Sequence, residues 1–117
     1  MKYHSKDHAL AQKILDYSVG LKEGEKIMIQ LSGLEGIGLM RALIEETRKR
    51  NAQPFFRIQD SEVMRILAEM GDKEFWEQQT NVEQLPLMKQ MDAFVGVRAT
   101  QNIYEQANVT KEQNKAF

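Results

Sequence analysis

Three short apolar runs alternate with helix-like segments along the chain, and this alternation limits the possible folds more than any other feature. The runs lie within residues 26–31, 51–59 and 92–99, and each has the length of a strand; the first is short and apolar enough to be a buried one. Strands that alternate with amphipathic helices pair in parallel through right-handed crossovers. We therefore expect an α/β fold with three layers. Helices should flank a short, mostly parallel sheet of about three strands, as in half of a Rossmann sheet.

The apolar residues between these runs recur at helical spacing. This periodicity predicts helices over residues 6–20, 38–50, 60–71 and 72–91. Gly20 stands where a helix would need a C-terminal cap, and Asp60 stands where a helix would need an N-terminal cap. The chain is therefore expected to change between helix and strand at clear local signals.

Two further signals concern helix ends in the second half of the chain. Pro86 lies inside the fourth helical segment and should divide it near Gln84 or Leu85, because proline lacks the amide hydrogen that a helix interior needs. Thr110 and Gln113 have the spacing of a capping box, which predicts that another helix begins in NVTKEQNKAF.

Composition excludes several classes of function. The chain has 117 residues, a net charge of -1 and no cysteine. This length suits one domain, and the charge provides no basic surface for nucleic acid or an anionic membrane. Disulfides and thiolate metal sites are excluded, and no apolar run approaches the roughly 20 residues of a membrane helix. We expect residues 1–117 to form a single cytoplasmic α/β domain that binds neither nucleic acid nor membrane.

The segment SGLEGIG follows the first apolar run and leads into a helix. Its glycines, Gly33, Gly36 and Gly38, lie where free amides at a helix N-terminus can hold an anion, and Asp60 lies where a ribose-binding acid is often found. However, the spacing is G-x-x-G-x-G, no Gly-Lys-Ser/Thr follows, and Glu35 would repel a phosphate. A nucleotide or small-anion site therefore remains an alternative to a simple strand-to-helix turn.

Polar residues after the third run extend this candidate site. Arg98 and Asn102 should lie at the same sheet edge as the glycine loop and Asp60, because the carboxyl ends of parallel strands share one edge. They could hold a carboxylate or an amide, or could equally cap the next helix. These residues complete the candidate crevice.

Other residues suggest no complete catalytic or metal centre. His4 and His8 have zinc-compatible spacing, but Asp7 is their only obvious neighbour, so solvated histidines are the favoured interpretation. Phe75 and Trp76 either form a partner surface or pack under the sheet, and packing is favoured. Most methionines within apolar stripes or strands should fill the core. These are Met28, Met40, Met64, Met70, Met88 and Met91.

Three stretches carry a resemblance to a known family. LAQKILDYSVGLKEGEKIMIQ, LMRALIEETRKRNAQPFFRIQD and MDAFVGVRATQNIYEQANVTKEQ resemble the amino-terminal domain of the thermophilic aminopeptidases, which include aminopeptidase T and aminopeptidase S. Ala52 and Pro54 match a motif of that family before the second strand. Asn51 replaces its usual glycine, and asparagine can also adopt the left-handed conformation.

The resemblance implies a role within a peptide hydrolase. These enzymes remove amino-terminal residues from peptides with a pair of divalent metal ions, zinc or cobalt, held in the carboxy-terminal part of a longer chain. No residue here matches those metal ligands, so neither catalytic nor metal residues are assigned. The resemblance implies that the chain is an amino-terminal scaffold domain that shapes a substrate cavity or a homodimer contact. Its partners would be the carboxy-terminal catalytic domain and peptide substrates.

Overall fold

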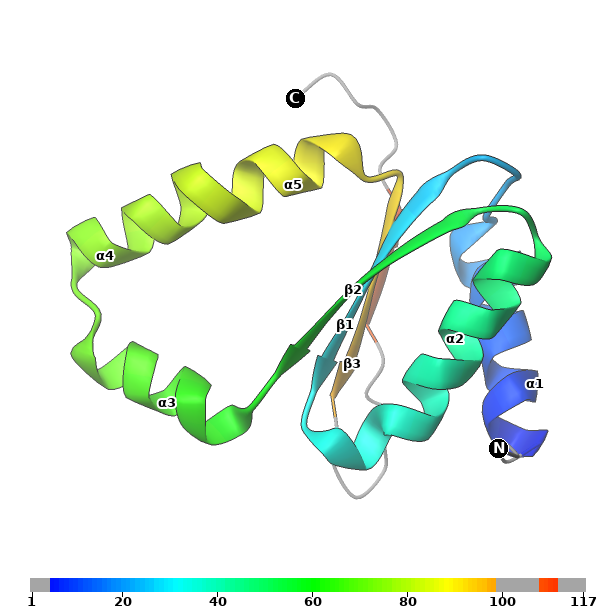
Figure 1. Cartoon of the computed structure of the whole chain (residues 1–117), viewed down its shortest axis with the longest axis horizontal. Helices are drawn as coiled ribbons and strands as arrows, with labels where there is room; N and C mark the ends of the chain where they lie inside the picture. Colours follow the sequence, from blue (N-terminus) through cyan, green and yellow to red (C-terminus); the bar gives the residue numbers. More distant parts are fainter. Residues whose placement is uncertain (1–4, 99–107, 112–117) are drawn as a thin grey trace.

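The computed structural model describes residues 5–98 and 108–111 and contains one sheet (Figure 1). Its strands are β1 (Lys26–Ser32), β2 (Gln53–Gln59), β3 (Ala93–Arg98) and β4 (Asn108–Lys111). The spatial order is β2-β1-β3-β4, with β1 parallel to both neighbours and β4 antiparallel to β3. The predicted α/β fold with a mostly parallel sheet is therefore confirmed.

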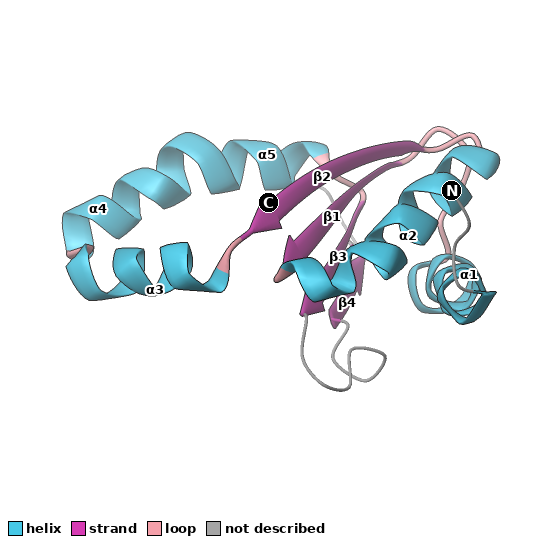
Figure 2. Cartoon of the chain, turned by 60° about the horizontal axis from the view of Figure 1, so that its bottom comes forward, coloured by secondary structure: helices cyan, strands magenta, loops and turns pink. Residues whose placement is uncertain are grey.

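Helices lie on both sides of this sheet, as Figures 1 and 2 show. Helices α1 (Ser5–Lys13) and α2 (Ile37–Lys49) lie along one face. On the other side are α3 (Ser61–Met70), α4 (Lys73–Gln78) and α5 (Leu85–Gln90), of which α3 and α4 extend away from the strands. We call residues 61–90 the arm. The order β2-β1-β3 with crossovers on opposite faces is typical of doubly wound sheets. In such sheets the strand order, not the strand direction, reverses between β1 and β3, which are parallel here. None of the described helices has both the length and the apolar character needed to cross a bilayer.

The hydrophobic core lies on only one side of the sheet. Alternate residues of β1, namely Ile27, Ile29 and Leu31, are fully buried, as expected when one strand face packs against helices. Their neighbours in the core come from α1 and its continuation, α2 and β3, and the arm contributes none. The full cluster comprises Ala11, Ile14, Leu15, Val19, Ile27, Ile29, Leu31, Leu39, Met40, Ala42, Leu43, Ala93, Val95 and Val97.

Local backbone signals act as the sequence predicts. Helix α1 continues as a π-helical segment, Ile14–Val19, and ends at Gly20 with a left-handed φ of 66°. Asn51 has a φ of 57°, so the asparagine adopts the left-handed conformation at the turn between α2 and β2. Both turns depend on residues that tolerate positive φ, which is why they could be recognised without knowing the fold.

Pro86 changes the helix without separating it into two. A π-helical segment, Gln79–Gln84, connects α4 to α5, and α5 begins at Leu85 with the proline in its first turn. The predicted boundary is therefore in the right place, but the chain stays helical across it. Proline is tolerated in a first helical turn, and the wider π-helical turns before it can accommodate the change in hydrogen bonding.

The predicted helix beginning in NVTKEQNKAF is wrong for residues 108–111, which form strand β4. Thr110 pairs with Phe94 and Val109 pairs with Val95 of β3. The open edge of β3 offers backbone hydrogen bonds to these β-branched residues, and this long-range pairing outweighs the local capping signal. Gln113, the other half of the proposed capping box, lies outside the described residues.

The apolar side chains of the arm are less buried than the sequence suggests. Met28, Met40 and Met91 are buried as expected, but Met70 is 81% exposed, so core filling is wrong for that residue. None of the residues of α3 is buried.

Phe75 and Trp76 meet edge to face, with ring centroids 5.0 Å apart. Both are half-buried beside Gly71 at the corner between α3 and α4, and neither belongs to the core under the sheet.

Candidate functional site

The carboxyl ends of the three parallel strands form one edge of the sheet. The amide of Gly33 donates to the carbonyl of Gln59 at 3.0 Å, which ties the end of β1 to the end of β2. Arg98 ends β3 level with the last residue of β1 and is exposed. The structure thus places Gly33, Asp60 and Arg98 along the same edge, whereas Asn102 lies outside the described residues.

The glycine loop at this edge is a compact turn. Gly33 has a φ of 94°, a value that side chains disfavour, and is followed by a single 3-10 turn, Leu34–Gly36. The amide of Gly36 donates to the carbonyl of Gly33 at 3.3 Å, and Gly36 is buried. Glu35 is exposed within this turn. Gly33 and Gly36 therefore both serve the change of direction from strand to helix.

Gly38 allows helix α1 to approach helix α2 closely. A Cβ atom at Gly38 would lie 2.7 Å from Oδ2 of Asp7, and the Asp7 side chain is almost fully buried. The Asp7 carboxylate therefore lies against the first turn of α2, where the helix dipole favours a negative charge. A carboxylate of the protein thus already occupies the surroundings in which an external phosphate would be expected, and this counts against the nucleotide alternative.

Asp60 serves the backbone of the next helix. Its Oδ2 accepts hydrogen bonds from the amides of Glu62 and Val63, each at 3.1 Å. This is the N-cap arrangement that the sequence predicts for Asp60, and such caps typically contribute about 1 kcal/mol. The carboxylate that could have bound a ribose is therefore engaged in starting α3.

We expect a double-mutant cycle to reveal the contact between Asp7 and Gly38. Gly38→Ala should cost about 1 kcal/mol more in the wild-type chain than in an Asp7→Ala background, because the added methyl group meets the carboxylate only when Asp7 is present. Urea unfolding of the four proteins measures this coupling. Additive effects of the two substitutions would contradict the contact.

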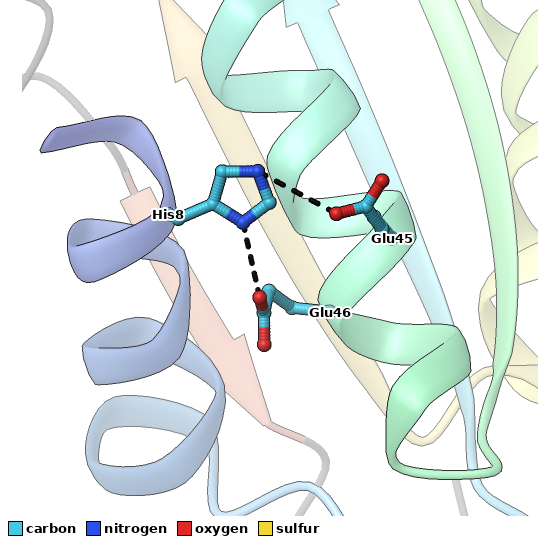
Figure 3. A group of neighbouring side chains, drawn as sticks. All are labelled: His8, Glu45 and Glu46. Atoms are coloured by element: carbon cyan, nitrogen blue, oxygen red, sulfur yellow. Dashed lines mark hydrogen bonds and ion pairs between the residues drawn. The ribbon is translucent and has the colours of Figure 1, made fainter. Parts of the chain in front are cut away.

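A second polar cluster joins α1 to α2, and it contains residues that the sequence did not single out together (Figure 3). His8 points from α1 toward α2, with Nδ1 3.0 Å from Oε2 of Glu46 and Nε2 3.5 Å from Oε1 of Glu45. One ligand atom from each of these three residues lies within 4.8 Å of the others, which is a spacing that metal sites share. His4, the other histidine considered for zinc, lies outside the described residues.

The charges around these three side chains favour a structural role. The Lys49 ammonium lies 3.3 Å from Oε2 of Glu46 and 3.8 Å from Oε1 of Glu45, so a cation already bridges both carboxylates. The two ring nitrogens of His8 face different carboxylates, whereas a single metal ion takes one nitrogen of a ring. A divalent ion would therefore have to displace Lys49, and the cluster is better described as an ion-pair network.

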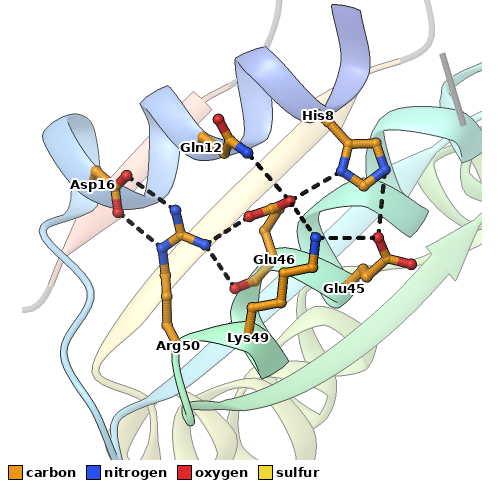
Figure 4. Close-up of polar contacts among 7 residues, drawn as sticks. All are labelled: His8, Gln12, Asp16, Glu45, Glu46, Lys49 and Arg50. Atoms are coloured by element: carbon orange, nitrogen blue, oxygen red, sulfur yellow. Dashed lines mark hydrogen bonds and ion pairs between the residues drawn. The ribbon is translucent and has the colours of Figure 1, made fainter. Parts of the chain in front are cut away.

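Glu46 is the centre of this network (Figure 4). Its side chain is only 3% exposed, and Arg50 donates to its Oε1 at 2.8 Å. The Arg50 guanidinium also contacts both oxygens of Asp16, at 2.8 and 3.0 Å. Arg50 thus clamps α2 to the π-helical continuation of α1, and its hydrogen bonds lower the pKa of Asp16.

The same contacts keep the buried carboxylate charged. Burial alone would raise the pKa of Glu46, but hydrogen bonds from Arg50 and from three further side chains outweigh burial and lower the pKa to about 2. The three are His8, Lys49 and Gln12. The folded state therefore holds a proton on Glu46 less tightly than the unfolded chain, and the resulting stability is lost as the pH falls.

We expect Glu46→Gln to separate this contribution from the rest of the acid sensitivity. The variant should be less stable than wild type by about 3 kcal/mol near neutral pH, because Arg50 loses a buried partner. The difference should shrink as the pH falls from about 5 toward about 2, where the wild-type carboxylate gains a proton. Urea unfolding across this range measures it.

Glu45→Gln is the matched control for that experiment. The Glu45 side chain is 42% exposed, so its loss should cost far less than the loss of Glu46. An unchanged acid dependence in Glu46→Gln would contradict the role assigned to the buried carboxylate.

A cavity of about 350 Å³ lies on the other side of the sheet, between the strands and the arm. Its apolar lining consists of Met28, Met64, Leu87, Met88 and Phe94. Its polar lining consists of Gln30, Arg57, Gln59 and Gln84. The cavity therefore combines an apolar interior with amides and one guanidinium, which is the usual character of a small-molecule site.

Large apolar side chains are exposed on the arm beside this cavity. We call Val63, Ile66, Met70, Val82 and Leu85 the apolar arm surface. All five are at least 46% exposed, and the first three follow one another at helical spacing on α3. Single exposed apolar residues are ordinary, but Val63, Ile66 and Met70 share one side of α3, and an uncovered apolar stripe of this kind is typical of a surface that binds a partner.

Strand β2 adds further exposed apolar residues at the sheet edge. Phe55 lies on the arm face of the sheet, as does its register partner Met28, while Phe56 and Ile58 alternate to the opposite face. All three β2 residues are exposed. Strand β2 is thus an edge strand whose two faces are only partly covered.

Comparison of the chain with protein families, with curated proteins and with solved structures finds no match in any of the three.

The structure brings together several residues that sequence reasoning did not connect. No role is assigned to Glu46 from the sequence, yet it is buried in the structure in contact with His8, 38 positions away. Arg57 lies in an apolar strand and becomes part of a cavity lining only through the arm. The sequence does contain one indication for Arg57. A single cation within a run of apolar strand residues usually lies on an exposed or functional face of the strand.

Proposed function

We propose that this chain is the non-catalytic amino-terminal domain of a metal-dependent aminopeptidase, which removes amino-terminal residues from peptides in the cytoplasm. The observation that carries the proposal is the apolar arm surface. Apolar patches of this kind mark contacts with partners, and a catalytic domain in the same enzyme is the partner that the sequence resemblance implies. The zinc or cobalt pair would belong to that domain.

The chemistry of the described residues supports a scaffold role. Within residues 5–98 the one histidine, His8, is held in the ion-pair network with Glu46. Asp60 caps a helix, and Asp7 lies against the first turn of α2. Among the described residues, these assignments leave the candidate crevice with Arg98, the exposed Glu35 and backbone groups, which can orient a peptide or a neighbouring domain.

We expect the purified chain alone to release no p-nitroaniline from leucine p-nitroanilide, with zinc or cobalt added, while a leucine aminopeptidase control is active. The chain should instead restore activity when it replaces the amino-terminal domain of an aminopeptidase T-like enzyme. Val63→Asp/Ile66→Asp should abolish that restored activity, because the two carboxylates would be buried in the domain contact.

Ala68→Asp is the matched control for the replacement experiment. Ala68 is exposed on α3 and lies away from the line of Val63, Ile66 and Met70. Equal activity of the Val63→Asp/Ile66→Asp and Ala68→Asp hybrids would contradict docking through the apolar arm surface. Saturable ATP binding by the wild-type chain, lost on Gly36→Val, would instead favour the nucleotide or small-anion alternative at residues 33–38.

A further inference from the structure

The cavity under the arm changes from apolar to polar along the strands. Met28 of β1 and Phe94 of β3 are register partners and form its apolar end. Gln30 and its register partner Arg57 lie two residues closer to the carboxyl edge, about 7 Å along the strands. Gln59 lies one further step along β2. The floor therefore presents apolar groups at one end and hydrogen-bond donors at the other.

The arm supplies an adaptable apolar wall. Met64 of α3 and Leu87 and Met88 of α5 line the cavity, and all three are half-buried. Methionine side chains are unbranched and have several rotatable bonds, so they adjust to the shape of an apolar ligand. A volume of about 350 Å³ lies at the lower end of the range for small-molecule pockets. The wall and the volume together suit a short hydrocarbon chain.

Arg57 gives the cavity lining a positive charge. It is the one charged residue among those that line the cavity, and its side chain is 25% exposed. Its Nη2 lies 3.5 Å from Oε2 of Glu83, whose side chain is 54% exposed. This is a long, solvent-exposed ion pair that an incoming carboxylate can displace at small cost. A guanidinium binds a carboxylate through two parallel hydrogen bonds.

The neighbouring amides extend the polar end. Nε2 of Gln30 donates to Oε1 of Gln59 at 3.1 Å, which fixes the two side chains beside Arg57 across the strands. Gly96, the register partner of Gln30 on β3, brings no side chain to this part of the floor. The hydrogen-bond donors and the space beside Gly96 therefore lie close together near the carboxyl end of β1. Doubly wound sheets bind ligands near this end, at the point where the strand order reverses.

We propose that this cavity binds a small amphipathic carboxylate, with the carboxylate on Arg57 and an unbranched apolar chain between Met28, Phe94 and the methionines of the arm. The site is separate from the apolar arm surface, so the proposal goes beyond the proposed function and stands whether or not a peptidase domain docks there.

The experiment titrates octanoate into the whole chain labelled with carbon-13 at its methionine methyl groups. The signals of Met28, Met64 and Met88 should shift in a saturable manner, at concentrations below those at which octanoate forms micelles. The signals of Met40, buried on the far side of the sheet, and Met70, exposed on the arm, should stay in place. Shifts that include Met70 equally, or no saturable shift at millimolar octanoate, would overturn the proposal.

Two ligands and three variants test the charge. Octylamine and octanol should bind at least tenfold more weakly than octanoate, because neither can pair with the guanidinium. Arg57→Gln should weaken octanoate binding about tenfold, whereas Glu83→Gln should strengthen it by removing the competing carboxylate. Arg65→Gln, on the exposed part of α3, is the matched control and should change nothing.

The Met40 signal also reports whether each variant is folded, since Met40 lies in the core. A folded Arg57→Gln variant that binds octanoate as well as wild type would overturn the assignment of the carboxylate to Arg57. Equal binding of octanoate, octanol and octylamine to the wild-type chain would show an apolar pocket without charge selectivity, which is also contrary to the proposal.

Discussion

Burial of one face of β1 against α1 and α2 is the interaction on which the rest of this structure depends. Ile27, Ile29 and Leu31 are fully buried there, and burial of each such side chain contributes roughly 1.5–3 kcal/mol. Leu39 and Leu43 meet them from α2. The polar contacts follow from this packing. With α1 held beside α2, His8 reaches Glu46, and Asp16 of the π-helical segment reaches Arg50. The buried Glu46 carboxylate is thereby surrounded by hydrogen-bond donors.

The opposite face of the sheet has no comparable core. It supports the arm through half-buried methionines and leaves a cavity and a group of exposed apolar side chains. Parts of a domain with few buried apolar contacts open more easily than the core, and binding elements are often drawn from such parts. The asymmetry therefore connects the fold to its proposed roles, since one face provides stability and the other provides surfaces for a ligand and for a neighbouring domain.

The features that could be predicted from sequence are those set by neighbouring residues or by general topology. Strand β1, the left-handed Asn51 and the Asp60 cap all follow from local chemistry, and the shared edge of Gly33, Asp60 and Arg98 follows from parallel pairing. Strand β4 was mistaken for a helix because the open edge of β3 that selects it is a long-range feature.

The chemical roles within the candidate site needed the fold itself. Nothing in the sequence indicates that Asp7 lies against Gly38, or that Glu46 is buried beside His8, because each contact joins distant positions on two packed helices. The apolar stripe of α3 was recognisable, but its exposure was not, because periodicity shows that a face is apolar and does not show what covers it.

Native-state hydrogen exchange tests the central claim, that stability rests on one side of the sheet and leaves the arm as the binding element. We predict that amides of β1, β3 and α2 exchange only through global unfolding. Amides of α3, α4 and α5 should exchange through local opening, at a free energy clearly below the global value. Equal protection of the arm and of β1 would contradict the account, because it would show that the arm is part of the same cooperative core.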